Sequence, residues 1–183
     1  NKDRLLEQWA QLRQEYNDPI MEIAYLVSSR YVIESNQMIR ELRSAIKAHP
    51  DWLILLSLEL HILQQQGNTE EALKVAKASA LRFPSSAGLL LALADIQLTL
   101  GQLEEAERNL KRVLTLDGSL TTARTLLARI YLIKGMTAEV MTQHMIILGD
   151  TTPPLAKVVH LKEFGAQLAY RGELREAEKM WAF

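Results

Sequence analysis

The residues of this sequence best suited to hold a metal ion or to move a proton are its four histidines, His49, His61, His144 and His160. A catalytic zinc site often places two histidines one helical turn apart in a His-Glu-x-x-His motif, and no pair of these histidines has that spacing. The sequence also lacks a Gly-x-Ser-x-Gly elbow and a glycine-rich phosphate loop. We therefore expect no metal centre, no cofactor and no catalytic residue, so that the chain is not an enzyme.

Composition argues against two further classes of partner. The 21 basic and 22 acidic side chains nearly cancel, so the chain has no net field to attract nucleic acid or an anionic membrane surface. Single-stranded nucleic acid is usually bound by stacking aromatics along a basic groove, yet only 6% of the residues are aromatic. No apolar run approaches the length of a membrane helix. We expect neither a nucleic-acid partner nor membrane insertion of this segment.

A six-residue motif recurs along the chain. It reads GNTEEA from Gly67, GQLEEA from Gly101, GMTAEV from Gly135 and GELREA from Gly172. The first three glycines are thirty-four residues apart, and the fourth follows after thirty-seven. A period of this length is typical of proteins in which short structural repeats stack on one another. The motif therefore predicts an array of repeats.

Each repeat is expected to be a pair of short helices. Strong helix formers dominate the sequence, and proline or glycine interrupts it often enough to predict eleven helices, counting both terminal ones. Between the interruptions, apolar residues follow helical spacing, as Leu90, Leu93 and Ala94 do. A pair of such helices cannot bury both apolar faces alone, whereas stacked pairs share one continuous core.

The residues after each glycine predict where the second helix of a pair begins. A capping residue followed three positions later by glutamate favours a helix start, and the glutamate also suits the helix dipole. This spacing is present in Asn68 with Glu71, Gln102 with Glu105, and Glu173 with Glu176. We therefore expect side-chain caps just after the turn glycines.

These features resemble the tetratricopeptide repeat, a family of thirty-four-residue helix-turn-helix units with small residues at fixed packing positions. The matching positions are Ala72, Ser79 and Pro84 around Gly67, Ala94 and Ala106 around Gly101, Ala128 and Tyr131 around Gly135, and Gly165 and Ala177 around Gly172. Val140 stands where the family usually has alanine. The resemblance implies an all-α fold, a right-handed α-solenoid of antiparallel helix pairs.

Counting by the register of the family, residues 1–183 form a single array. Residues 1–17 are expected to be the second helix of a preceding repeat, and residues 19–52 a degenerate repeat without its turn glycine. Regular repeats are expected at 53–86, 87–120 and 121–154, and a truncated repeat at 158–183. The first residue is Asn rather than Met, and we expect a fragment of a longer bacterial-type array.

The family also implies where a partner binds, because the first helix of each pair usually lines a concave face that holds a peptide or a helix. The register predicts the partner-binding residues Ile23, Val27, Arg30, Ser57, His61, Gln64, Leu91, Asp95, Leu98, Thr125, Arg129 and Lys162; Leu132 and Ala166 share it. Asp95 and Arg129 occupy equivalent positions in successive repeats, so an alternative is that they pair with each other. The charged set with which co-chaperones of this family grip a terminal carboxylate is absent.

The resemblance therefore favours a non-catalytic scaffold that binds another protein or peptide on its concave face. By analogy with similar arrays, we expect a place in a bacterial envelope assembly such as polysaccharide export. The compartment is left open, with the periplasm favoured over the cytoplasm. The alternative is a regulatory or oligomerisation module that controls a fused effector domain. Self-association through the exposed ends of the array is a further expectation.

Overall fold

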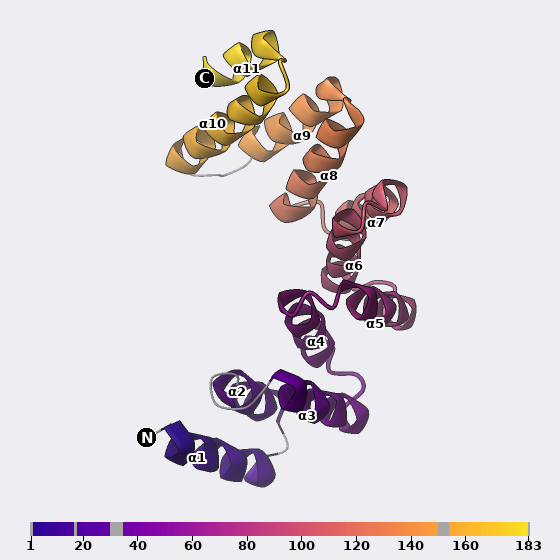
Figure 1. Cartoon of the computed structure of the whole chain (residues 1–183), viewed down its shortest axis with the longest axis vertical. Coiled ribbons are helices and arrows are strands. Elements are labelled where there is room, and N and C mark those ends of the chain that lie inside the picture. The colour runs from indigo at the N-terminus through magenta and orange to yellow at the C-terminus, as the bar shows by residue number, and fades with distance from the viewer. Residues whose placement is uncertain (1, 17, 30–34, 150–153, 183) are drawn as a thin grey trace. The chain divides into compact units, whose positions relative to one another are not determined.

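The computed structural model describes residues 2–16, 18–29, 35–149 and 154–182, and this part of the chain forms eleven α-helices and no strand (Figure 1). The all-α fold and the number of helices expected from the sequence are confirmed. The chain divides into two compact units, residues 1–109 (unit 1) and residues 110–183 (unit 2).

Unit 1 contains six helices and the first part of a seventh. Their bounds are α1 Lys2–Glu15, α2 Pro19–Ser29, α3 Ser35–Ala48, α4 Leu53–Gln65, α5 Thr69–Arg82, α6 Ala87–Thr99 and α7 Leu103–Leu116. Each helix from α1 to α5 contacts the next one, and α4 also contacts α6. The first helices of two successive pairs are therefore neighbours, which is how stacked helix pairs form a common core.

Large apolar side chains close the core of unit 1. Leu55, Leu63, Leu89 and Leu90 are at most 1% exposed, and burial of a leucine side chain stabilises a fold by about 1.5–3 kcal/mol. Gln97 of α6 is also buried, and its Oε1 accepts a hydrogen bond of 2.7 Å from the Asn109 amide. The helical spacing of apolar residues thus predicted the buried face of α6.

Unit 2 contains the end of α7 and four further helices. Their bounds are α8 Thr121–Lys134, α9 Thr137–Gly149, α10 Pro154–Tyr170 and α11 Leu174–Trp181. The helices pack as neighbouring pairs, α8 with α9 and α10 with α11 (Figure 1). Val140 is fully buried at the position where the family has alanine. On α10, Gly165 contacts the Trp181 indole of α11 so closely that a Cβ atom would overlap the ring.

The recurring glycines close the four tight turns between paired helices. Gly67, Gly101, Gly135 and Gly172 have φ angles of 72°, 73°, 74° and 81°, in the left-handed region where L side chains are strained. At Gly67 the glycine N–H donates to the Gln64 carbonyl, and the next N–H, that of Asn68, donates to the Leu63 carbonyl. This pair of bonds is a Schellman motif, and the other three turns repeat it.

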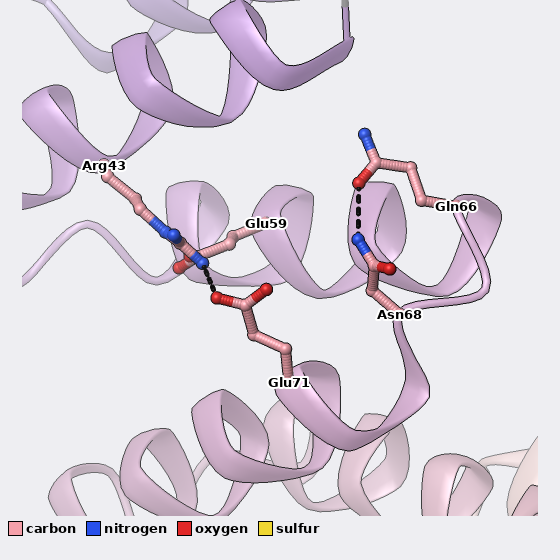
Figure 2. A network of polar contacts seen from close by, with 5 residues as sticks. All are labelled: Arg43, Glu59, Gln66, Asn68 and Glu71. Atoms are coloured by element: carbon pink, nitrogen blue, oxygen red, sulfur yellow. Dashed lines mark hydrogen bonds and ion pairs between the residues drawn. The ribbon is translucent and has the colours of Figure 1, made fainter.

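The expected side-chain caps after these turns are absent at two sites, so that prediction was wrong there. Neither Asn68 nor Glu173 caps its helix through its side chain. The Asn68 amide instead donates to Gln66 at 3.0 Å (Figure 2), and a Glu173 oxygen accepts from the Thr137 hydroxyl at 2.6 Å. The backbone of Asn68, at φ −77° and ψ 57°, is not in the extended region that capping residues adopt.

A charged cluster joins three helices of unit 1. Figure 2 shows Arg43 of α3 reaching Glu59 of α4 at 2.7 Å and Glu71 of α5 at 2.6 Å. The hydrogen bonds to Glu59 and then Glu71 raise the pKa of the Arg43 guanidinium above its usual value. Glu59 is buried, so its carboxylate depends on Arg43 for compensation. Glu71, one of the recurring glutamates, therefore bridges helices.

None of the helices in the described ranges is long and apolar enough to cross a membrane.

Candidate partner-binding hollow

Unit 2 has a hollow of about 750 Å³ between α8 and α10, the first helices of its two pairs. We refer to it below as the α8–α10 hollow. Its lining residues are Thr125, Ala128, Arg129, Leu132, Ile133, His144, His160, Glu163, Phe164, Ala166, Gln167, Tyr170 and Arg171. All but His144 of α9 and Arg171, which directly follows α10, belong to α8 or α10.

The hollow has an apolar base and an exposed apolar rim. Phe164 and Ala128 are buried, at 2% and 3% exposure, whereas Ile133 and Tyr170 are 51% and 95% exposed. Exposed aromatic and aliphatic side chains beside a recess are typical of sites that bury a partner's side chain. Ile133 and Tyr170 therefore present apolar surface to solvent beside the hollow.

Two histidines meet in the wall of the hollow, which the sequence analysis did not expect. His144 Nδ1 and His160 Nε2 lie 2.6 Å apart, so one of these nitrogens donates a hydrogen bond and the other accepts it. The His144 ring also stacks on Phe164, with ring centroids 3.7 Å apart. Burial, and secondarily the charge of His160, lowers the pKa of His144 from 6.5 to about 4.

The second histidine of this pair is less enclosed. Burial lowers the pKa of His160, and the charge of Glu163 opposes this shift. A neutral His144 can orient the His160 ring through the shared hydrogen bond. In the part of the chain that the structure describes, no three metal-ligating side chains come together, so the pair lacks a third ligand from these residues.

Besides the histidines, the hollow is lined by one acidic and two basic side chains, Glu163, Arg129 and Arg171. Arg171 is held in place, because its guanidinium donates to the Leu132 carbonyl and lies 3.5 Å from Glu173. Arg129 is exposed, and within the described residues of unit 2 no carboxylate forms an ion pair with it. Within the described part of unit 2, its charge is therefore uncompensated.

The structure brings four positions of the predicted register to this hollow. Thr125, Arg129 and Leu132 line it from α8, and Ala166 lines it from α10. Lys162 instead lines a second hollow of about 330 Å³, together with Val158, Leu161, Met180 and Trp181.

Six of the predicted residues of unit 1 lie on α4 and α6. Gln64 of α4 donates to Asp95 of α6 at 3.1 Å, which places these two positions on neighbouring faces. His61 is exposed and makes a 2.9 Å hydrogen bond with Gln65. Ser57 is exposed and Leu91 is half-buried, whereas Leu98 is only 6% exposed and offers little surface to a partner.

Some predictions stay untested. Arg30 lies outside the described residues, and the side chains of Ile23 and Val27 are likewise outside them. Asp95 belongs to unit 1 and Arg129 to unit 2, so the alternative that they pair remains a prediction.

Sequence reasoning missed most of the α10 lining. The positions carried over from the family on α10 are Lys162 and Ala166, and only Ala166 lines the hollow, whose other α10 residues lie on a different part of the helix surface. A local signal exists, because Glu163, Phe164, Gln167 and Arg171 follow His160 by three, four, seven and eleven residues and therefore share one helix face. That face becomes one wall of a hollow only because α8 supplies the opposite wall.

Comparison with known proteins agrees with this architecture. Residues 63–130 match the tetratricopeptide repeat model. Among solved structures, the chain is similar to a tetratricopeptide repeat protein from Parabacteroides merdae (16% identity, TM-score 0.75, covering 96% of this chain and 69% of that one). It is also similar to TTC0263 of Thermus thermophilus (21% identity, TM-score 0.69, covering 92% of this chain and 91% of that one). A third similar structure is YrrB, a tetratricopeptide repeat protein with an unusual peptide-binding site (19% identity, TM-score 0.67, covering 96% of this chain and 89% of that one).

At these identities the likeness to solved structures concerns the fold alone. A comparison with curated protein sequences gives no match. The glycine turns, the buried small residues and the stacked helix pairs agree with the family model, and residues 63–130 are identified as tetratricopeptide repeats.

Proposed function

We propose that the chain is a protein-interaction scaffold that binds a segment of a partner protein in the α8–α10 hollow. Tetratricopeptide repeats serve as interaction scaffolds, and the fold of this chain supports that role at the coarse level. The observation that carries the finer proposal is the hollow itself, a recess of about 750 Å³ between two first helices. Four positions of the family register, Thr125, Arg129, Leu132 and Ala166, line this recess.

The lining supports binding rather than catalysis. The base is apolar around Phe164, and the rim exposes Tyr170 and Ile133, which together could enclose one or two side chains of a partner. The polar groups are spread along the recess, as in sites that recognise an extended or helical segment. The absence of catalytic activity stays an expectation.

A selection experiment tests the proposal. The full chain is immobilised and used to select binders from a displayed library of random twelve-residue peptides, and affinities are then measured by fluorescence anisotropy. Gln167→Trp places a bulky ring in the hollow from an exposed position, and we expect at least a tenfold loss of affinity. The matched control is Thr142→Trp, on an exposed position of α9 that does not line the hollow.

Equal binding by both variants, or a library without any binder, would contradict the proposal. Circular dichroism of each variant shows whether the helices are intact, so loss of binding is not confused with unfolding.

The expected place in a bacterial envelope assembly such as polysaccharide export stays a prediction, because no described residue bears on it. The same holds for the alternative of a regulatory or oligomerisation module. Light scattering at several concentrations would test self-association directly.

A further inference from the structure

We infer that the segment bound in the α8–α10 hollow carries a large apolar side chain next to an aspartate or glutamate. The apolar side chain packs on Phe164, and the neighbouring carboxylate pairs with Arg129. This inference rests on the proposed function and specifies the chemistry of the partner.

The apolar half of the inference follows from the base and the rim of the hollow. Phe164 is buried at the base of the recess, and its ring is held in place because it stacks on His144. Tyr170 and Ile133 stand exposed around it. An apolar side chain that enters between Tyr170 and Ile133 removes its own surface and parts of those two side chains from water. A polar side chain would gain no comparable stabilisation there.

The inference of a neighbouring carboxylate follows from the two arginines of the lining, because only one of them has its charge compensated within unit 2. Arg171 already donates to the Leu132 carbonyl and lies near Glu173, so its charge is partly compensated. Arg129 is exposed, lines the hollow and has no ion-pair partner within the described part of unit 2. A guanidinium with free donors binds carboxylates with two parallel hydrogen bonds.

Glu163 is the one carboxylate in the lining, and it is not placed to neutralise Arg129. The contact between Arg171 and Leu132 shows that the C-terminal ends of α8 and α10 meet. Measured from that contact, Arg129 lies about 4.5 Å back along α8 and Glu163 about 12 Å back along α10, at 1.5 Å per residue. No ion pair joins Glu163 to Arg129 within the described part of unit 2, so an acidic segment meets an uncompensated guanidinium, whereas a basic segment would meet two arginines.

The test uses the peptides selected on the full chain. Selected sequences should be enriched in an acidic residue adjacent to Leu, Met, Phe, Tyr or Trp. For the tightest peptide, we expect its acidic residue changed to lysine to lower the affinity for the wild-type chain about tenfold. The Arg129→Glu variant should bind the acidic peptide with an affinity lowered by a similar factor. It should bind the lysine peptide more tightly than the acidic one.

The matched control is Arg175→Glu, which makes the same charge change at an exposed position of α11 outside the hollow and should leave both affinities within about twofold. One outcome overturns the inference and leaves the proposed function standing. In that outcome the selected peptides are basic or neutral, their affinity falls for the Gln167→Trp variant, and their affinity for the Arg129→Glu variant is unchanged. If no peptide responds to Gln167→Trp, the proposed function itself fails. The peptide charge variants are measured on the wild-type chain, so the result holds even where a protein variant folds poorly.

Discussion

Replacement of His144 by glutamine should remove much of the acid sensitivity of unit 2. In the folded chain His144 is buried against Phe164 and beside His160, so its pKa falls to about 4, whereas in the unfolded chain it has the ordinary value of 6.5. Between these two values the unfolded state binds more protons than the folded state. Stability is therefore unaffected by this group well above pH 6.5, falls as the pH drops through the interval, and levels off below pH 4.

The size of the effect follows from the two pKa values. By linkage, a group that titrates at 6.5 when unfolded and at about 4 when folded lowers the free energy of unfolding by about 2 kcal/mol at pH 5 and by about 3 kcal/mol at pH 4. The pKa of His160 is also lowered, so it adds to the loss in the same direction. Glutamine does not titrate and can still hydrogen-bond with His160.

Urea unfolding at pH 7.5, 6 and 5 measures this difference, with Trp181 fluorescence reporting on unit 2 in a background of Trp9→Phe and Trp52→Phe. We expect the wild-type chain to lose about 2 kcal/mol more than His144→Gln between pH 7.5 and 5. His61→Gln is the matched control, because His61 is exposed, and it should keep the wild-type pH dependence. Equal pH dependence of wild type and His144→Gln would refute the reasoning.

Two further substitutions probe packing and charge. Arg43→Ala leaves the buried Glu59 carboxylate without its cation and should lower the free energy of unfolding by about 2 kcal/mol, whereas Arg82→Ala, which removes an exposed surface pair, should lower it by less than about 1 kcal/mol. Urea unfolding compares the two, and equal losses would show that Arg43 does not compensate a buried charge. Gly165→Ala forces a methyl group against the Trp181 indole and should destabilise the chain by about 1–3 kcal/mol, with a change in Trp181 fluorescence; an unchanged spectrum would contradict this packing.

The repeat itself could be predicted from the sequence because its signals are local. A glycine with positive φ, a run of helix formers and a helical spacing of apolar residues each concern a few neighbouring positions, and they located the turns at Gly67, Gly101, Gly135 and Gly172. The caps failed for a local reason as well. At Gly67 the Schellman turn already uses the Asn68 N–H, and the Asn68 side chain bonds to Gln66 instead of to the helix.

The site could be predicted only in part because it depends on how helices cross. His144 and His160 are sixteen residues apart, on different helices, and nothing in their spacing indicates that the two rings meet. Thr125 and Arg129 were found because the register of α8 carries over from the family. The facing flank of α10 was missed because a single helix does not show which of its sides a neighbour will leave open.

The four glycine turns have a consequence for how such a chain can evolve. Their paired hydrogen bonds join main-chain atoms only, so the bend between two helices does not depend on which side chains surround it. Substitutions at Arg129 or Gln167 change the lining of the recess while the hairpins keep their shape. Descendants of this sequence can therefore acquire new ligands by drift at a few solvent-facing positions, without inventing a new architecture.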